Sequence, residues 1–125
     1  MGGWIGVDLD ATLAEYGGWK GYSTIGKPIC PMVDRIKGWL AQGKEVRIFT
    51  ARVCRNMGEI VVGAEADTEK RIKDETLLIQ DWLERECALP RLAVTCEKDF
   101  AMIELWDDRA IQMIPNTGLR ADGKL

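Results

Sequence analysis

The sequence predicts a single α/β domain, with a mainly parallel sheet and helices on the faces of that sheet. Three observations lead to this fold class. Short apolar runs of strand length alternate with segments of helical periodicity, an order typical of parallel sheets. A length of 125 residues suits one domain, and no repeat or composition shift marks a boundary within it. The hydrophobic share of 46% and the charged share of 30% are those of an ordinary globular domain.

The first expected strand ends in a group of polar side chains. An apolar run from Trp4 leads to Asp8 and Asp10, and a strand over residues 5–9 would send both carboxylates to the same side. Two neighbouring carboxylates repel each other, so a bound cation or a retained proton is expected between them. The alternative is a plain acidic turn that closes the strand, with Thr12 as a helix cap.

A loop, a helix and a second strand are expected next. Residues 14–31 are rich in glycine and aromatic residues, which predicts a flap lying over the end of the first strand. Helical spacing of apolar residues predicts a helix from Pro31 to about Gln42, and Gly43 supplies the stop. Residues 45–50 alternate as a strand that ends at Thr50, whose hydroxyl suits either a phosphate contact or a helix cap.

In the second half of the chain, the secondary structure is predicted clearly for some segments and not for others. Residues 53–67 give no clear pattern and are consistent with a small insertion. The other expected elements are a helix over 68–87, strands over 91–95 and 102–106, a short helix over 109–114 and a loosely held tail over 115–125. Residues 1–125 therefore read as one domain without a sizeable second lobe.

Composition excludes several classes of function. The chain has no histidine, which excludes histidine bases and histidine-ligated zinc. Its net charge of −3 gives no reason to expect nonspecific binding to nucleic acid. No apolar run approaches the length of a membrane span, and we expect a cytoplasmic protein. The four cysteines are widely spaced, without a C-x-x-C pair, so reduced thiols are expected at Cys30, Cys54, Cys87 and Cys96.

Polar residues close each of the expected strands. Parallel strands bring their carboxyl ends to one edge of the sheet, which is where open α/β sheets bind ligands. We therefore expect convergence at that edge of Asp8, Asp10, Thr50, Lys98, Asp107 and Asp108. Each of these residues has a simpler explanation when taken alone; Lys98, for example, is either a surface lysine, the usual fate of a lysine, or a cation at the strand end.

In order and placement these motifs resemble those of the haloacid dehalogenase (HAD) superfamily of phosphohydrolases. The family's D-x-D-x-T motif corresponds to residues 8–12, its strand ending in threonine to residues 46–50, its lysine to Lys98, and its acidic strand end to residues 103–108. The resemblance spans residues 4–114 and implies a Rossmann-like three-layer α/β/α sandwich of the small, capless type. It also implies an enzyme, a phosphoric monoester hydrolase.

The resemblance assigns a role to each matching residue. Asp8 would be the nucleophile that forms an aspartyl-phosphate, and Asp10 the general acid and then the base. Thr50 and Lys98 would hold the phosphoryl oxygens, and Lys98 would also contact Asp8. Mg²⁺ is the implied cofactor, with ligands from Asp8, the backbone carbonyl of Asp10, and one or both of Asp107 and Asp108. Arg52 would either grip substrate or lie solvated on the segment that follows, and the same holds for Arg55 and Arg109.

Two other classes of protein compete with the hydrolase. A receiver-type phosphoacceptor domain uses similar residues, but it carries its nucleophilic aspartate on a later strand, before the threonine. A catalytically silent HAD-like module would bind phosphate or metal without turnover. For the hydrolase we expect a small phosphate ester or a nucleotide as substrate, with a homo-oligomer as an option. The flap aromatics Tyr16, Trp19 and Tyr22 would either stack on a base or pack the flap.

Overall fold

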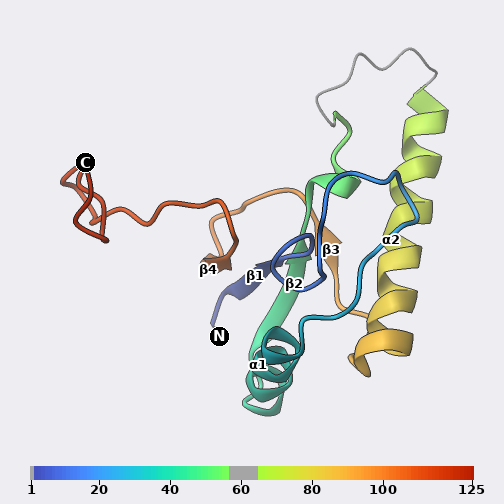
Figure 1. Ribbon diagram of the computed structural model, residues 1–125, viewed down its shortest axis with the longest axis horizontal. Helices are drawn as coiled ribbons and strands as arrows, with labels where there is room; N and C mark the ends of the chain where they lie inside the picture. Colours follow the sequence, from blue (N-terminus) through green and yellow to red (C-terminus); the bar gives the residue numbers. More distant parts are fainter. Residues whose placement is uncertain (1, 57–64) are drawn as a thin grey trace.

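The structure, a computed structural model, describes residues 2–56 and 65–125, and its centre is a parallel sheet (Figure 1). The four strands are β1 (Trp4–Asp8), β2 (Glu45–Phe49), β3 (Val94–Thr95) and β4 (Met102–Trp106), in the spatial order β3-β2-β1-β4. The helices are α1 (Cys30–Ala41), the 3₁₀ helix η1 (Ala51–Val53) and α2 (Glu65–Cys87). All strand pairs are parallel, so the predicted α/β class is confirmed.

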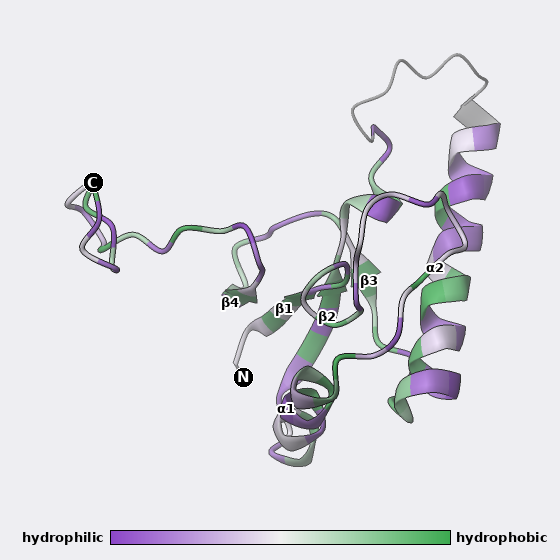
Figure 2. Ribbon diagram, in the orientation of Figure 1, coloured by the Kyte–Doolittle hydropathy of each residue, from purple (hydrophilic) through white to green (hydrophobic). Residues whose placement is uncertain are grey.

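Both α-helices pack on the same face of the sheet. In register, Ile5 pairs with Val46 and Val7 with Ile48, so these four side chains share one face. They belong to a single core cluster with Ile36 of α1 and with residues of α2, among them Ile79 and Leu83. Figure 2 shows the corresponding pattern, with hydrophobic strands and alternating hydrophilic and hydrophobic bands along α2. The strand order takes the chain from β1 to β2 to β3 in one direction, and crossovers of the usual right hand then bring both helices to one face.

The opposite face of the sheet carries no helix among the residues that the structure describes. The chain from β3 to β4 crosses this face through residues 96–101, in which Asp99 accepts a hydrogen bond from the Trp4 indole at 2.8 Å and pairs with Arg47 at 3.5 Å. Arg47 stacks on the Trp4 ring at 4.5 Å, and Trp4 is 1% exposed. Among residues 2–56 and 65–125, helices thus form one layer in place of the expected two, because this crossover is too short to hold a helix.

Most of the expected elements lie within a few residues of their predicted bounds. The short helix expected over 109–114 is wrong: this segment has no helix, and Ile111, Met113 and Ile114 are exposed. After β4 the chain leads away from the sheet toward the C-terminus (Figure 1). Residues 14–29 form loops and turns, in agreement with the expected flap. The unreadable stretch 53–67 lies partly outside the described residues.

A disulfide joins Cys54, just after η1, to Cys96, just after β3, with the Cα atoms 5.5 Å apart. The expectation of four reduced thiols is therefore wrong for this pair. The two cysteines are 42 positions apart in sequence and meet because β2 and β3 are neighbours whose carboxyl ends lie at one edge. No helix among the described residues is long and apolar enough to cross a membrane.

Candidate active site

A cavity of about 460 Å³ opens at the carboxyl ends of β1, β2 and β4. It lies where the three strands deliver polar residues to one edge of the sheet, the usual ligand position in open α/β folds. Its lining is formed by Asp8, Asp10, Ala11, Tyr16, Trp19, Phe49, Thr50, Ala51, Arg52, Asp107, Asp108 and Arg109. The structure therefore brings together all but one of the side chains that the sequence assigned to a site.

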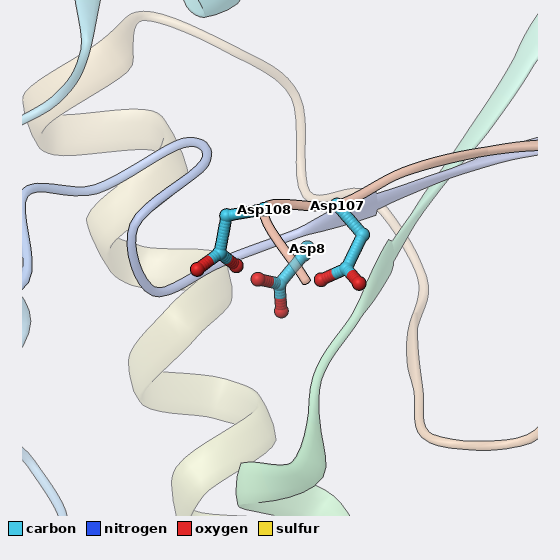
Figure 3. Close-up of side chains that lie close together, drawn as sticks. All are labelled: Asp8, Asp107 and Asp108. Atoms are coloured by element: carbon cyan, nitrogen blue, oxygen red, sulfur yellow. The ribbon is translucent and has the colours of Figure 1, made fainter. Parts of the chain in front are cut away.

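Three carboxylates form an acidic cluster in this cavity. Asp8 ends β1, and Asp107 and Asp108 follow β4, which pairs with β1 up to Val7 and Trp106. One carboxylate oxygen from each residue lies within 4.8 Å of the others, and Figure 3 shows the Asp8 carboxylate between those of its two neighbours. Burial raises the pKa of Asp8 to about 8, with further contributions from Asp108 and Asp107.

The donor set of this cluster fits a hard divalent cation. Carboxylate oxygens are the ligands that Mg²⁺ prefers, and opposite ligands of an octahedral Mg²⁺ are about 4.2 Å apart. Asp8, Asp107 and Asp108 could therefore hold the ion implied by the resemblance, and Asp10 borders the same cavity.

The turn after β1 sets the direction of the next acidic side chain. The amides of Leu13 and Ala14 donate to the carbonyl of Leu9 at 2.9 and 2.8 Å, which closes a tight turn directly after the strand. Ala11 lies at its tip with a φ of 71°, a left-handed conformation that an alanine adopts at a cost. The Thr12 hydroxyl donates to Asp8 at 3.5 Å, a long contact, so Thr12 faces the acidic cluster.

Arg52 is buried and paired rather than solvated, and it lines the cavity. It is 3% exposed, and its Nε and Nη2 atoms donate to the two carboxylate oxygens of Asp10 at 2.8 and 2.9 Å. Its Nη1 atom donates to Glu75 of α2 at 3.0 Å. Burial alone would lower the pKa of Arg52, but its hydrogen bonds and charge pairing with Asp10 and Glu75 raise it above the ordinary value.

Thr50 caps the next helical turn, as one of its two expected roles requires, and it also lines the cavity. Its side-chain oxygen accepts a hydrogen bond from the Arg52 amide at 3.2 Å and so caps η1. Because the oxygen acts as the acceptor in that bond, the hydroxyl proton is still available to a ligand in the cavity, which Thr50 also lines. Thr50 itself is 2% exposed, so the donor is held in place by its surroundings.

The flap packs against the same arginine. The Trp19 ring lies 5.1 Å from the Arg52 guanidinium and contacts Tyr22 edge-on, and Tyr22 in turn lies 4.8 Å from the guanidinium of Arg71. Trp19 and Tyr16 remain 43% and 39% exposed where they line the cavity. Trp19 can therefore pack against Arg52 and still offer its exposed ring surface to a ligand in the cavity. Tyr22 packs within the flap and against Arg71, outside the cavity lining.

Lys98 is the predicted site residue that lies outside the cavity lining. It is exposed in the crossing segment 96–101, which turns from β3 across the far face of the sheet. The cationic side chain that does line the cavity in an exposed position is Arg109. Arg55 forms an exposed ion pair with Glu69, away from this lining.

One residue of functional interest was missed in the sequence. Glu75 is 2% exposed, although glutamate is seldom buried without a partner. A signal was present: Glu75 follows Ile72 by three positions and precedes Ile79 by four, which places its carboxylate on the apolar stripe of α2.

Comparison of the chain with protein-family models, curated proteins and solved structures gave no match.

Proposed function

We propose that this protein is a magnesium-dependent phosphatase that hydrolyses a phosphomonoester through an aspartyl-phosphate intermediate. The observation that carries the proposal is the convergence on one cavity of a three-carboxylate cluster, the second aspartate of the D-x-D-x-T motif, and the strand-end threonine. The parallel sheet would bring any strand-end residues to this edge, so the support comes from their chemistry, three carboxylates beside a second aspartate and a hydroxyl. The HAD-like assignment rests on the order of these motifs.

In this proposal the chain's own residues perform the chemical steps. Asp8 attacks phosphorus, while Asp10 protonates the departing oxygen and then takes a proton from the water that cleaves the acyl phosphate. The Thr50 hydroxyl donates to a phosphoryl oxygen. Mg²⁺ at Asp8, Asp107, Asp108 and the Asp10 carbonyl would offset the repulsion between the Asp8 carboxylate and the phosphate dianion, which is about 8 kcal/mol at 4 Å.

The positive side chain that the resemblance assigns to Lys98 requires a different candidate. Arg52 lines the cavity but already donates to Asp10, Glu75 and the Thr24 carbonyl. Arg109 is exposed, lines the cavity and directly follows two of the clustered aspartates. We therefore propose Arg109 as the group that receives the ester's non-bridging oxygens.

The cavity walls support a choice of substrate class. Trp19 and Tyr16 present exposed ring surface beside the acidic cluster, and a volume of about 460 Å³ accommodates a small ester or a nucleotide. A base or aryl group stacked on Trp19 would place the phosphate toward the acidic cluster. We propose such a small phosphomonoester or nucleotide as substrate.

The cytoplasm remains the proposed location, and the Cys54–Cys96 disulfide is the feature that argues against it.

A phosphate- or metal-binding module without turnover is the second candidate. The observation in its favour is the position of Lys98 outside the cavity lining, which leaves the resemblance incomplete. Release of phosphate from an aryl phosphate and a panel of alkyl and nucleoside monophosphates, with and without Mg²⁺, separates the two. We expect Mg²⁺-dependent release that is lost in Asp8→Asn and kept in Asp34→Asn, a matched change at an exposed position of α1. Absence of release across the panel would favour the binding module.

A further inference from the structure

A chain of three buried or half-buried ionic side chains runs from the cavity into the protein. Asp10 comes from the turn after β1, Arg52 from η1 and Glu75 from α2. The side chains of Arg52 and Glu75 are 4% and 3% exposed, and that of Asp10 is 20% exposed. Burying charges to this extent is unfavourable unless each is paired, and the distances of 2.8 and 3.0 Å supply that pairing.

The guanidinium in the middle of this chain is held from several sides. Its Nε and Nη2 atoms bind the two oxygens of Asp10, and Nη2 also donates to the Thr24 carbonyl at 2.7 Å. Its Nη1 atom binds Glu75. A two-point contact with a planar guanidinium fixes both the position and the rotation of a carboxylate. The orientation of Asp10 therefore depends on where Arg52 is held.

Glu75 determines where Arg52 is held. It is outside the cavity lining, so it contacts neither substrate nor the acidic cluster. One of its oxygens accepts from Arg52 at 3.0 Å, and the carboxylate also accepts from the backbone amide of Ser23 at 3.1 Å. The same carboxylate thus binds the arginine and the flap that carries Trp19.

We propose that Glu75 is a positioning residue, which holds Arg52 in its two-point contact with Asp10 and fixes the flap at Ser23. Through these two links it sets the geometry of the acid that serves the leaving group, without touching the reacting atoms. This inference rests on the proposed phosphatase function and adds a residue on α2 to its machinery.

The first test compares substrates with different leaving groups in the Glu75→Gln variant. Glutamine keeps the length and volume of the side chain but removes the charge that holds Arg52. An aryl phosphate with a good leaving group needs little protonation, whereas an alkyl phosphate depends on Asp10. We expect kcat for the alkyl ester to fall at least about ten-fold more than kcat for the aryl ester, with little change in KM for either.

The control variants distinguish the effect of the Glu75 charge from effects of its side-chain length and of a general loss of folding. Asp74→Asn, which removes the neighbouring exposed partner of Lys70, should leave both rates unchanged. Glu75→Asp keeps the charge but shortens the side chain, and should recover part of the alkyl-ester rate; it also serves if Glu75→Gln does not fold. Hydrogen exchange of the Ser23 amide, measured without metal or substrate, should be faster in Glu75→Gln than in wild type or Asp74→Asn.

The outcomes distinguish this inference from the function on which it rests. Equal losses on both esters, or unchanged exchange at Ser23, would show that Glu75 only stabilises the fold, and would overturn the positioning role while the phosphatase stands. A wild-type protein that hydrolyses neither ester with Mg²⁺ would overturn the proposed function, and the positioning role with it. A selective loss on the alkyl ester together with faster Ser23 exchange supports both.

Discussion

The guanidinium of Arg52 binds the carboxylate of Asp10 through two hydrogen bonds of 2.8 and 2.9 Å. This contact joins the end of β1 to the segment after β2, and it makes one acidic residue of the cavity chemically different from the others. Asp8, Asp107 and Asp108 face one another, whereas Asp10 faces a cation. The two aspartates of the D-x-D-x-T motif therefore lie in different electrostatic surroundings.

Replacing Arg52 with methionine should destabilise the protein by about 3 kcal/mol, because it leaves Glu75 buried and without its charged partner. Urea denaturation measures the change. Arg85→Met is the matched control, since Arg85 pairs with Glu86 at an exposed position and its loss should cost less than about 1 kcal/mol. A change of similar size in both variants would contradict the importance of the buried pair.

The stability of the metal-free protein should fall as the pH rises from about 4 to about 8. The pKa of Asp8 is raised in the folded protein, to about 8, so the folded state retains a proton that the unfolded chain has already released. The stabilising contribution of that proton is complete below pH 4 and is lost as the pH passes through 8. Thermal unfolding across this range should show the slope in wild type and a flatter profile in Asp8→Asn.

Magnesium should stabilise the protein more strongly at pH 9 than at pH 6. Binding at the acidic cluster requires Asp8 to lose the proton favoured by its raised pKa, so the apparent affinity rises with pH. A magnesium concentration 100-fold above Kd would add about 2.7 kcal/mol of stability. The shift should diminish in Asp107→Asn and Asp108→Asn, and the larger loss identifies the direct ligand. Equal shifts at both pH values would place the ion elsewhere.

Ala11→Gly should stabilise the fold by up to about 1 kcal/mol. Ala11 has a φ of 71°, which glycine adopts without the steric cost that a Cβ brings. The greater freedom of glycine in the unfolded chain offsets part of the gain. Chemical denaturation measures the difference, and Ala41→Gly, at the exposed end of α1, should shift stability in the opposite direction.

Arg109→Gln should raise KM for a phosphomonoester about ten-fold, whereas Lys98→Gln should leave KM and kcat close to wild type. The reason is position, because Arg109 lines the cavity and Lys98 is exposed outside that lining. Steady-state kinetics on one ester measure both variants. A large loss of kcat in Lys98→Gln would instead favour the assignment made from the sequence resemblance.

Much of the fold and most of the cavity lining were predictable, because parallel strands bring their ends to one edge whatever their separation in sequence. Asp8, Thr50 and Asp107 needed only strand periodicity to be placed. Lys98 was not predictable, because the direction in which a chain leaves a short strand depends on tertiary contacts, here the hydrogen bond and ion pair of Asp99 with Trp4 and Arg47.

The remaining errors have similar physical causes. A helix over 109–114 would need a surface on which to bury Ile111 and Ile114, and both side chains are exposed in the structure. The burial of Arg52 depends on its pairing with Glu75, 23 positions away in sequence, and periodicity alone does not reveal such a pair. The disulfide likewise joined cysteines whose spacing matched no motif.

The bond between Cys54 and Cys96 makes a closed covalent ring of the chain between them, and the whole of α2 lies on that ring. Cleavage of a single peptide bond within the ring would open it without separating the polypeptide into two molecules. The helix bearing Glu75 would then stay attached to the rest of the protein until a reductant broke the sulfur bridge.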